Sequence, residues 1–371
     1  MDEVELVRRR LRTVGLGGPL DAATPGEVVA WFGALQSQDY HPAKWAVGQR
    51  LGGAVTDAGL DRAFDDGELL RTHVLRPTWH FVTPDDIGWL LALTGPRVHV
   101  LNGYAYRQFD LDDAVLRRGT EVIAGALAGS TYLTRAQVGD VLASAGIVAE
   151  RFRLAYILMF AELEGVVCSG PLAGKQHTYA RLDERAPNAR TLDRDAALAE
   201  LTRRYFTSHG PATVKDFAWW SSLTRTDIAA GLALAGDALE SHEVDGVTYW
   251  AAAGTADGPG AGDVDETAVH LVQAYDEYLV GYTESKRLLD LSGVAAGTRL
   301  DGAANSVLLL GSQVAGRWRR TLKPGEVHLD VGLYEPFRAA VAPGLQAAAD
   351  VHGAFVERTA TVATAPIGVA S

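Results

Sequence analysis

Two short helices followed by a hairpin form the pattern that most constrains how this chain folds. Thr213–Asp216 and Thr224–Asp227 each pair a threonine with an aspartate three residues later, which is a signal for the start of a helix. The β-prone run that follows is interrupted by Asp245-Gly246, a dipeptide that favours a tight hairpin turn. The order helix, short turn, helix, hairpin predicts a winged helix-turn-helix.

The same order is expected twice more, earlier in the chain. Thr134–Gln137 is a capping box before one helix, and a second helix is expected at about Arg151–Leu163, ahead of two strand-like runs. The N-terminal copy is less regular: helices follow Thr24, Pro42 and Thr56, and the β-prone segment Leu69–Val82 closes it. A further helix is expected to start at Thr83 and to continue through Ile87, Trp89, Leu90 and Leu91.

The C-terminal part has a different pattern. Residues 254–265 are rich in Gly, Ala and Asp and are interpreted as a linker or surface loop. Beyond them we expect strands at Ser306–Gly311 and Val327–Val331, a helix at Pro336–Ala349 and a last strand at Ala354–Ala360. The predicted fold class is α+β. We expect winged-helix regions at 1–112, 113–190 and 191–253, and a mixed α/β module at 266–371.

Composition narrows the class of protein. The net charge of −12 argues against a protein that coats nucleic acid nonspecifically, but it allows a positive charge confined to one surface. No apolar run reaches the ~18 residues of a membrane span, and the N-terminus has no signal-peptide pattern. The single cysteine, Cys168, excludes an internal disulfide. We therefore expect a cytoplasmic protein with no membrane partner.

The most informative candidate for a catalytic site is Gln36-Ser37-Gln38, where the helix after Thr24 is expected to end. In a bent or extended segment, side chains two residues apart can point the same way. Two amide groups held together can bind one water molecule by several hydrogen bonds. Gln36 and Gln38 are therefore candidate water-positioning residues.

Two basic segments are candidates for contacting DNA. The loop of the second winged helix carries Lys175, Gln176 and His177, which combine a positive charge with hydrogen-bonding groups, although a purely structural loop is an equal alternative. The second segment alternates as a strand does, with one face suited to phosphate and a solvated edge strand as its alternative. Its basic residues are Arg317, Arg319, Arg320 and Lys323.

Other kinds of site find little support in the sequence. There is no His-Glu-x-x-His, no Cys-x-x-Cys, and no glycine pattern of a nucleotide-binding loop, so we expect no metal and no cofactor. Asp276-Glu277 lies among aromatic residues. These carboxylates either form an acid/base pair or, as we favour, join domains through hydrogen bonds.

Four segments together resemble the winged-helix, AlkZ-like family of bacterial DNA glycosylases. They are Leu35–Tyr40, Arg76–Val82, Tyr275–Tyr282 and Gly316–Thr321, so the resemblance covers essentially the whole chain. It implies three tandem winged helices in a C-shaped arrangement around duplex DNA. It also implies a catalytic Gln-x-Gln at Gln36 and Gln38, with Ser37 where the family usually has an aliphatic residue. Candidate supporting residues in the matched segments are Arg76, His80, Asp276 and Glu277.

The resemblance further implies an enzyme that removes N7-alkylguanine from double-stranded DNA, and we expect it to be monofunctional and monomeric. Some family members also unhook interstrand crosslinks made by genotoxic natural products, so the role is alkylation repair or self-resistance. Alkylation at N7 makes guanine a cationic leaving group, and positioned water then suffices without a strong base. The alternatives are a noncatalytic winged-helix DNA-binding regulator and a protein that sequesters a toxic small molecule.

Overall fold

One order of elements occurs three times in the computed structural model, which describes residues 1–371 except 19, 255–264, 296–305, 337–338 and 368–371. The order is a helix, a short strand or bridge, two helices and a hairpin. The first unit comprises α2 (Pro25–Phe32), β1 (Leu35–Gln36), α3 (Tyr40–Arg50), α4 (Asp57–Asp66), β2 (Leu70–His73) and β3 (Trp79–Val82).

The second and third units repeat this order. The second comprises α6 (Asp113–Ala126), β4 (Leu133–Thr134), α7 (Arg135–Ser144), α8 (Phe152–Leu163), β5 (Val167–Ser169) and β6 (Thr178–Arg181). The third comprises α10 (Arg194–Ser208), a bridge from Ala212 to Trp250, α11 (Val214–Ser221), α12 (Arg225–Ala235), the 3₁₀ helix η1 (Gly236–Ala238), β7 (Leu239–Val244) and β8 (Val247–Ala252). In every unit the segment before the helix pair joins the last strand of the hairpin, as in β1-β3-β2 and β4-β6-β5.

Local sequence signals explain where most of these helices begin. In each case below, the threonine side chain accepts a backbone N–H of the first turn, and the side chain three residues on accepts the threonine N–H. These capping boxes confirm the predicted starts at Thr24, Thr134, Thr213 and Thr224. The hairpin turn is also confirmed, because Asp245 and Gly246 both have positive φ, 49° and 75°.

The expected start at Thr83 is wrong by about one turn. Helix α5 (Ile87–Gln108) begins after Asp86, which makes no side-chain cap. The Asp86 carboxylate instead accepts hydrogen bonds from the Thr83 hydroxyl, from Trp89 Nε1 at 2.9 Å and from Arg204. Two local side chains and the distant Arg204 therefore take the carboxylate that would have completed a capping box at Thr83.

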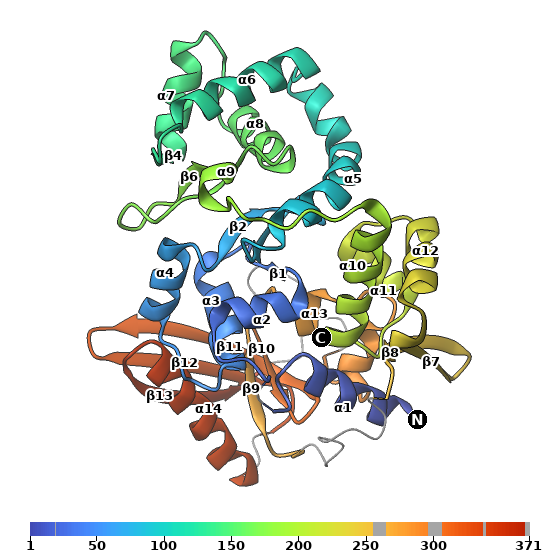
Figure 1. Ribbon diagram of the computed structural model, residues 1–371. Coiled ribbons are helices and arrows are strands. Elements are labelled where there is room, and N and C mark those ends of the chain that lie inside the picture. Colours follow the sequence, from blue (N-terminus) through green and yellow to red (C-terminus); the bar gives the residue numbers. More distant parts are fainter. Residues whose placement is uncertain (19, 255–264, 296–305, 337–338, 368–371) are drawn as a thin grey trace.

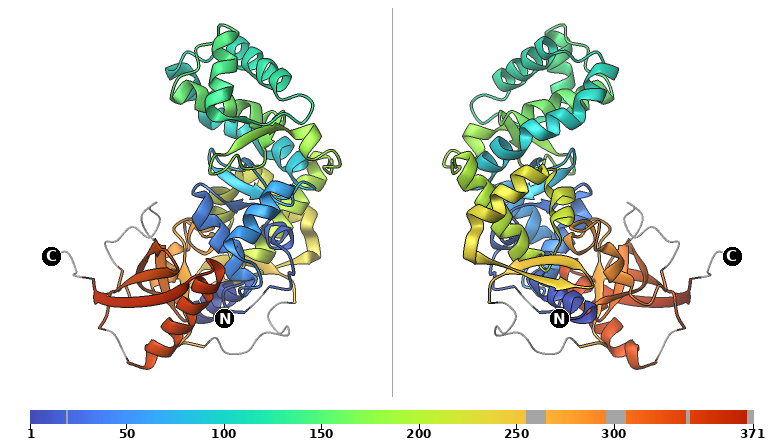
Figure 2. Two further views of the ribbon diagram at one scale, coloured as in Figure 1. Left: turned by 90° about the vertical axis from the view of Figure 1, so that its left-hand side faces the viewer. Right: turned by 90° about the vertical axis from the view of Figure 1, so that its right-hand side faces the viewer.

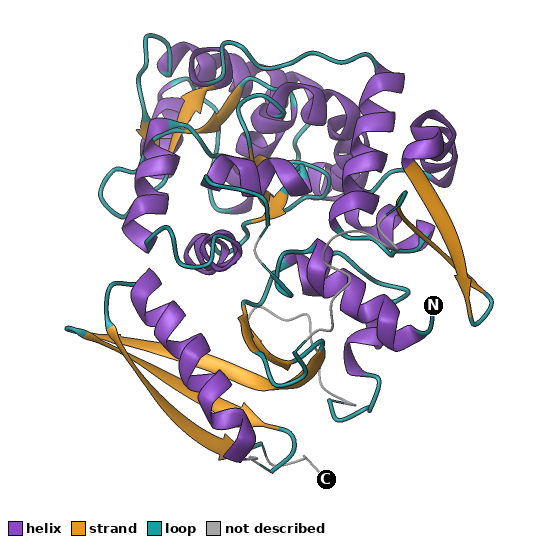
Figure 3. Cartoon of the chain, turned by 60° about the horizontal axis from the view of Figure 1, so that its bottom comes forward, coloured by secondary structure: helices purple, strands orange, loops and turns teal. Residues whose placement is uncertain are grey.

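The C-terminal part forms a five-stranded sheet in the order β13-β12-β11-β10-β9. Only β12 and β13 run parallel, and α14 makes the connection between them. Figure 3 shows this helix lying across one face of the sheet. The elements are β9 (Val269–Val272), α13 (Glu277–Val280), η2 (Lys286–Asp290), β10 (Ser306–Leu310), β11 (Gln313–Lys323), β12 (Glu326–Leu333), η3 (Ala339–Val341), α14 (Ala342–Phe355) and β13 (Thr359–Pro366).

The expected boundaries of the last helix and the last strand are wrong by about six residues. The helix ends at Phe355, because Leu345, Ala349 and His352 continue a buried stripe to Phe355, whose ring packs on Trp45. The last strand is consequently displaced to Thr359–Pro366. The expected linker lies, apart from residues 254 and 265, outside the described residues.

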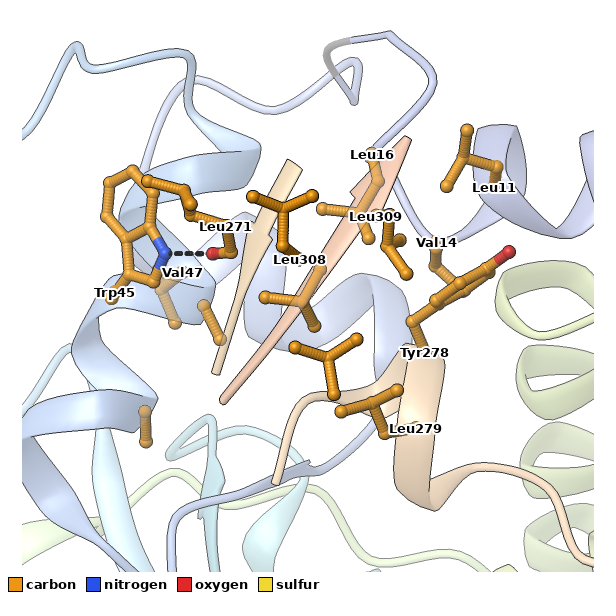
Figure 4. Close-up of a cluster of buried hydrophobic side chains, with 14 of the residues drawn as sticks. Leu11, Val14, Leu16, Trp45, Val47, Leu271, Tyr278, Leu279, Leu308 and Leu309 are labelled. Atoms are coloured by element: carbon orange, nitrogen blue, oxygen red, sulfur yellow. Dashed lines mark hydrogen bonds between the residues drawn. The ribbon is translucent and has the colours of Figure 1, made fainter. Parts of the chain in front are cut away.

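The largest hydrophobic core joins the start of the chain to the C-terminal sheet. It combines residues of α1 (Glu3–Thr13), α2, α3 and α4 with residues of β9, β10 and α13. Figure 4 shows Leu11, Trp45 and Leu308 in this core, where Trp45 Nε1 donates to the Leu271 carbonyl at 2.6 Å. This packing brings the segment after Val272 against the first unit.

The second unit lies at one end of the molecule and the C-terminal sheet at the other, with the first and third units between them (Figures 1 and 2). Helix α5 leads from the first unit into the second, and the short α9 (Leu182–Arg185) follows β6. The second unit has its own core around α6, α7 and α8. Across the described residues, none of the helices is both long and apolar enough to cross a bilayer.

Candidate active site

Gln36 lies at the end of β1, the edge strand of the first unit's sheet. It is opposite His80 of β3, and only 5% of its surface is exposed. The next residue continues the pairing, since Ser37 N–H donates to the Trp79 carbonyl at 2.8 Å. The Gln-x-Gln motif is therefore held on a sheet edge between α2 and α3.

The backbone of the motif is held from two further directions. Glu277 Oε1 accepts the Gln36 N–H at 2.7 Å. On the other side, Arg71 Nε donates to the Ser37 carbonyl at 3.1 Å and its Nη2 donates to the Gln38 carbonyl at 3.2 Å. Polar groups from two distant segments therefore fix all three peptide units.

Both glutamine side chains have a fixed orientation. Gln36 Oε1 accepts from Arg76 Nη2 at 2.7 Å, and Gln38 Oε1 accepts from the Trp79 N–H at 3.3 Å. An amide oxygen has two lone pairs, so each can accept a second hydrogen bond from water. The side chains are thus arranged as acceptors.

Gln36 lines a pocket with a volume of about 590 Å³ between the first and third units. The walls come from the β2–β3 loop, from α5, from α11 and the turn after it, and from the segment around α13. The other lining residues are Arg76, Pro77, Thr78, Arg97, Leu101, Ala218, Trp219, Ser222, Leu223, Tyr275, Val280 and Lys286. Gln38 is half-buried beside Trp79 and does not line it.

Glu277 is completely buried behind Gln36. Its Oε2 accepts from Trp220 Nε1 at 2.8 Å and lies 3.1 Å from His209 Nε2. Burial raises the pKa of this carboxyl, but the hydrogen bond and charge of His209 and the Gln36 N–H outweigh burial and lower it to about 2. The carboxylate is therefore ionised, fully engaged and absent from the pocket wall, which suits positioning rather than proton transfer.

Asp276 has a separate partner. Its two oxygens accept from the two Nη atoms of Arg50, both at 2.8 Å, and the pair is fully buried. The same carboxylate caps α13 by accepting the Tyr278 N–H. Asp276 and Glu277 therefore face different groups and are not a matched acid/base pair.

His80 is buried beside the motif and is neutral. Its Nδ1 lies 2.9 Å from the Thr78 carbonyl, while its Nε2 has no hydrogen-bond partner within the described part of the chain. Burial and the charge of Arg76 lower the His80 pKa to about 3. Burial also lowers the pKa of Arg76 from its ordinary value.

The seven candidate DNA contacts lie away from this pocket, since none of them lines it. Lys175 and Gln176 are exposed on the β5–β6 loop, whereas His177 is half-buried with its ring 4.7 Å from that of Tyr40. Burial lowers the pKa of His177 to about 4, so its ring is neutral. Lys175 is the charged member of this loop.

The other four lie on β11. Arg319 and Lys323 are exposed, Arg317 donates to Tyr334 Oη at 3.0 Å, and Arg320 is half-buried. Trp318 points into the core, where Nε1 donates to the Val272 carbonyl. The β5–β6 loop and the β11–β12 turn both project to the left in Figure 1.

The sequence patterns missed four residues of this region. Arg71 lies in a strand, and its spacing gives no sign that it reaches the carbonyls of the motif. His209 and Trp220 follow helix signals that do not predict a polar role. Arg97 is one of several charged residues on α5. Long-range packing brings all four into place, so no local pattern could have identified them.

Comparison with known proteins identifies the class of protein to which this chain belongs. The sequence matches the family model described as DNA glycosylase AlkZ-like over residues 29–355. The fold is similar to that of Streptomyces sahachiroi DNA glycosylase AlkZ, with a TM-score of 0.82 and 21% sequence identity, covering 98% of this chain and 100% of that chain. No curated protein matches the sequence.

These findings define the class as the DNA glycosylases, enzymes that hydrolyse N-glycosyl bonds. Within that class the chain belongs to the DNA glycosylase AlkZ-like family. The family expected from the four sequence segments is thereby confirmed.

Proposed function

We infer that the enzyme hydrolyses the N-glycosidic bond of N7-alkylguanine in duplex DNA, and that it unhooks interstrand crosslinks attached at N7. The observation that supports this most is the position and orientation of the Gln36 side chain. Its amide oxygen lies at the pocket wall and is oriented by Arg76, while Glu277 behind it is buried and occupied. No Asp or Glu occurs among the described residues that line the pocket.

A site without an accessible base suits a substrate that is already activated. N7-alkylguanine carries a positive charge and leaves as a neutral base, so departure needs no general acid. The remaining tasks are to place a water molecule and to stabilise an oxocarbenium-like sugar. Oriented amide oxygens can do both, because they accept hydrogen bonds from water and direct their negative ends toward positive charge.

The three units act as winged helices that form a C-shaped, concave surface for duplex DNA. Their boundaries are 1–112, 113–190 and 191–253, followed by the module at 266–371. An open surface admits a crosslinked guanine, which cannot be flipped into a closed pocket because it is tied to the other strand. The enzyme acts as a monomer, in alkylation repair or in self-resistance to a genotoxic natural product.

The two projecting segments bind DNA phosphates. Lys175 and Gln176 act from the β5–β6 loop, beside His177, and Arg319 and Lys323 act from β11, near Arg317 and Arg320. Each charge removed from a phosphate contact should lower the slope of log affinity against log salt by about 1. A Lys323→Ala variant with an unchanged slope would contradict this assignment.

The decisive experiment measures free base. Wild-type enzyme is incubated with duplex DNA that contains N7-methylguanine, and released base is quantified by chromatography. Gln36→Ala and Gln38→Ala should each slow release by about 10²-fold, the size expected for a preorganised polar group. Gln108→Ala, at the exposed end of α5, is the matched control and should release base at the wild-type rate. Full activity of the double variant would exclude the proposed mechanism.

The same assay separates the alternatives. A noncatalytic regulator would bind undamaged DNA selectively and release no base. The enzyme is monofunctional, so the DNA strand should remain intact and borohydride should trap no adduct. Because Lys286 lines the pocket, a trapped adduct at that residue would show a lyase instead.

A further inference from the structure

Three positively charged side chains from separate segments converge on the pocket beside Gln36. Arg76 comes from the β2–β3 loop, Arg97 from α5 and Lys286 from the start of η2. None of the described residues that line the pocket is a carboxylate, and the charge of Glu277, which acts on Arg76, lies buried behind Gln36. The charged side chains at the pocket wall are therefore all positive, although the whole chain carries a net charge of −12.

Arg76 lacks a partner for part of its guanidinium. Its Nη2 donates to Gln36 Oε1, and the group lies 5.8 Å from the centre of the Trp219 ring. Its Nε is buried without a hydrogen-bond partner in the part of the chain that the structure describes. A buried donor on a cation costs free energy until an acceptor, best an anion, satisfies it.

Arg97 is anchored and exposed at the same time. Its Nε donates to the Ser222 carbonyl at 3.2 Å, in the turn after α11. Leu101, one turn further along α5 and 46% exposed, and Trp219, 51% exposed, give the pocket apolar surface next to its cations. Such a combination suits a ligand with an anionic group attached to a less polar ring, as in a sugar phosphate.

The positive lining disfavours a cationic base as the occupant of the pocket. A cationic N7-alkylguanine base would be repelled by three nearby cations within a partly desolvated pocket. A backbone phosphate would be attracted, and would satisfy Arg76 with geometry that guanidinium groups favour. The volume of about 590 Å³ is ample for a phosphate with its sugar.

We propose that this pocket binds one backbone phosphate next to the damaged nucleotide through Arg76, Arg97 and Lys286. The proposal rests on the proposed function, from which it takes alkylated duplex DNA as the substrate and Gln36 as the catalytic amide. Arg76 contacts both the phosphate and Gln36, so DNA binding fixes the orientation of the catalytic amide. The base stays outside the pocket while the sugar is presented to Gln36.

The test uses duplexes with one N7-methylguanine and a single neutral methylphosphonate linkage, moved stepwise along both sides of the lesion. At one position the neutral linkage should weaken wild-type binding about tenfold, which corresponds to about 1.4 kcal/mol. Arg97→Ala should weaken binding of the ordinary duplex by a similar factor and leave binding of that neutral duplex almost unchanged. Because Arg97→Ala and the neutral linkage remove the same contact, their effects on the binding free energy should not add.

Arg107→Ala is the matched control, because Arg107 is exposed on the same helix but does not line the pocket. Any effect it has should be the same with the charged and the neutral linkage. If Arg97→Ala and the neutral linkage add at every position scanned, the pocket binds no phosphate and the proposal is wrong.

The assay also keeps the two proposals apart. Wild-type base release is measured on the ordinary duplex, and its absence would overturn the proposed function while the binding cycle still tests the phosphate site. Arg76→Lys retains the charge but loses the guanidinium group, which can donate to Gln36 Oε1 and to the phosphate at the same time. It should therefore slow release more than it weakens binding, whereas Lys286→Ala should mainly weaken binding. An Arg76→Lys variant with wild-type release would show that Arg76 does not orient Gln36.

Discussion

Glu277 Oε1 accepts a hydrogen bond from the backbone N–H of Gln36 at 2.7 Å, although 241 positions separate the two residues. The other oxygen of Glu277 contacts His209 and Trp220 of the third unit. One carboxylate thus joins the first unit, the third unit and the C-terminal module behind the pocket. Changes at this point should alter Gln36 without removing any group from the pocket wall.

Glu277→Gln should slow base release by about 10- to 100-fold. The new amide can still accept the Gln36 N–H, but its NH₂ group then faces the Trp220 N–H and His209. Donors that face each other in a buried site cost about 1–3 kcal/mol. Single-turnover release and denaturant unfolding measure the effects on rate and on stability.

A second variant separates positioning from general damage to the fold. Trp220→Phe removes the opposing indole donor, so in the Glu277→Gln background it should restore part of the lost rate. If Glu277→Gln alone releases base at the wild-type rate, the carboxylate does not position Gln36.

Arg71→Lys should lower kcat with little change in KM. Lysine keeps the charge but cannot donate to both the Ser37 and Gln38 carbonyls while stacking on Trp79, whose ring centre lies 4.5 Å from the Arg71 guanidinium. The expected loss is about tenfold, equivalent to about 1.4 kcal/mol of transition-state stabilisation. Arg62→Lys, on the exposed face of α4, is the control. A change confined to KM would assign Arg71 to DNA binding instead.

Asp276→Asn should affect stability more than catalysis. The variant leaves the Arg50 guanidinium without its buried counter-ion, which costs about 3–5 kcal/mol. The free energy of unfolding should fall by that order, while base release below the unfolding temperature stays near the wild-type rate. A large loss of rate in a fully folded variant would show that Asp276 has a direct catalytic role.

Acid should destabilise the protein through His352. This ring is fully buried against Trp45 and Trp318, and burial and the charge of Arg320 lower its pKa from 6.5 to about 3. Because this pKa is lowered in the folded state, the unfolded chain binds a proton first as the pH falls. The contribution of the neutral, buried His352 ring to stability is therefore complete above about pH 6.5 and is lost as pH falls toward 3. His352→Phe should remove this dependence.

Denaturant unfolding at pH 7.5 and pH 5.5 measures the effect. Protonation of His352 in the unfolded chain should contribute about 1.4 kcal/mol to the difference between the two pH values. The difference should be smaller by this amount in His352→Phe, while other buried histidines still contribute. If the variant and the wild type show the same difference in unfolding free energy between the two pH values, protonation of His352 does not affect stability.

Local signals in the sequence predicted the helix starts at four threonines and the turn at Asp245-Gly246, because neighbouring residues satisfy those conformations. They failed at Thr83, where the distant Arg204 binds the Asp86 carboxylate. They also failed around Phe355, whose position depends on packing against Trp45. Local periodicity does not encode such tertiary contacts.

For the candidate site, too, local sequence patterns predicted some features and missed those that depend on tertiary contacts. The spacing of Gln36 and Gln38 drew attention to the motif, and the aromatic surroundings of Asp276 and Glu277 favoured a structural role for those carboxylates. The sequence could not predict that Glu277 holds Gln36, or that Arg71 holds the next two carbonyls, because these contacts follow from the shared core. Nor could it separate the pocket cations from the β11 cations.

The core that the start of the chain shares with the C-terminal sheet also affects the order in which parts of the chain can fold during synthesis. Residues near position 36 leave the ribosome long before β9 and Glu277, yet they need the sheet to cover Trp45 and the carboxylate to hold the Gln36 N–H. During synthesis the nascent chain therefore carries the Gln-x-Gln motif without the support behind it. The Gln36 N–H therefore meets its acceptor on Glu277 only after the C-terminal part of the chain has been made and has docked.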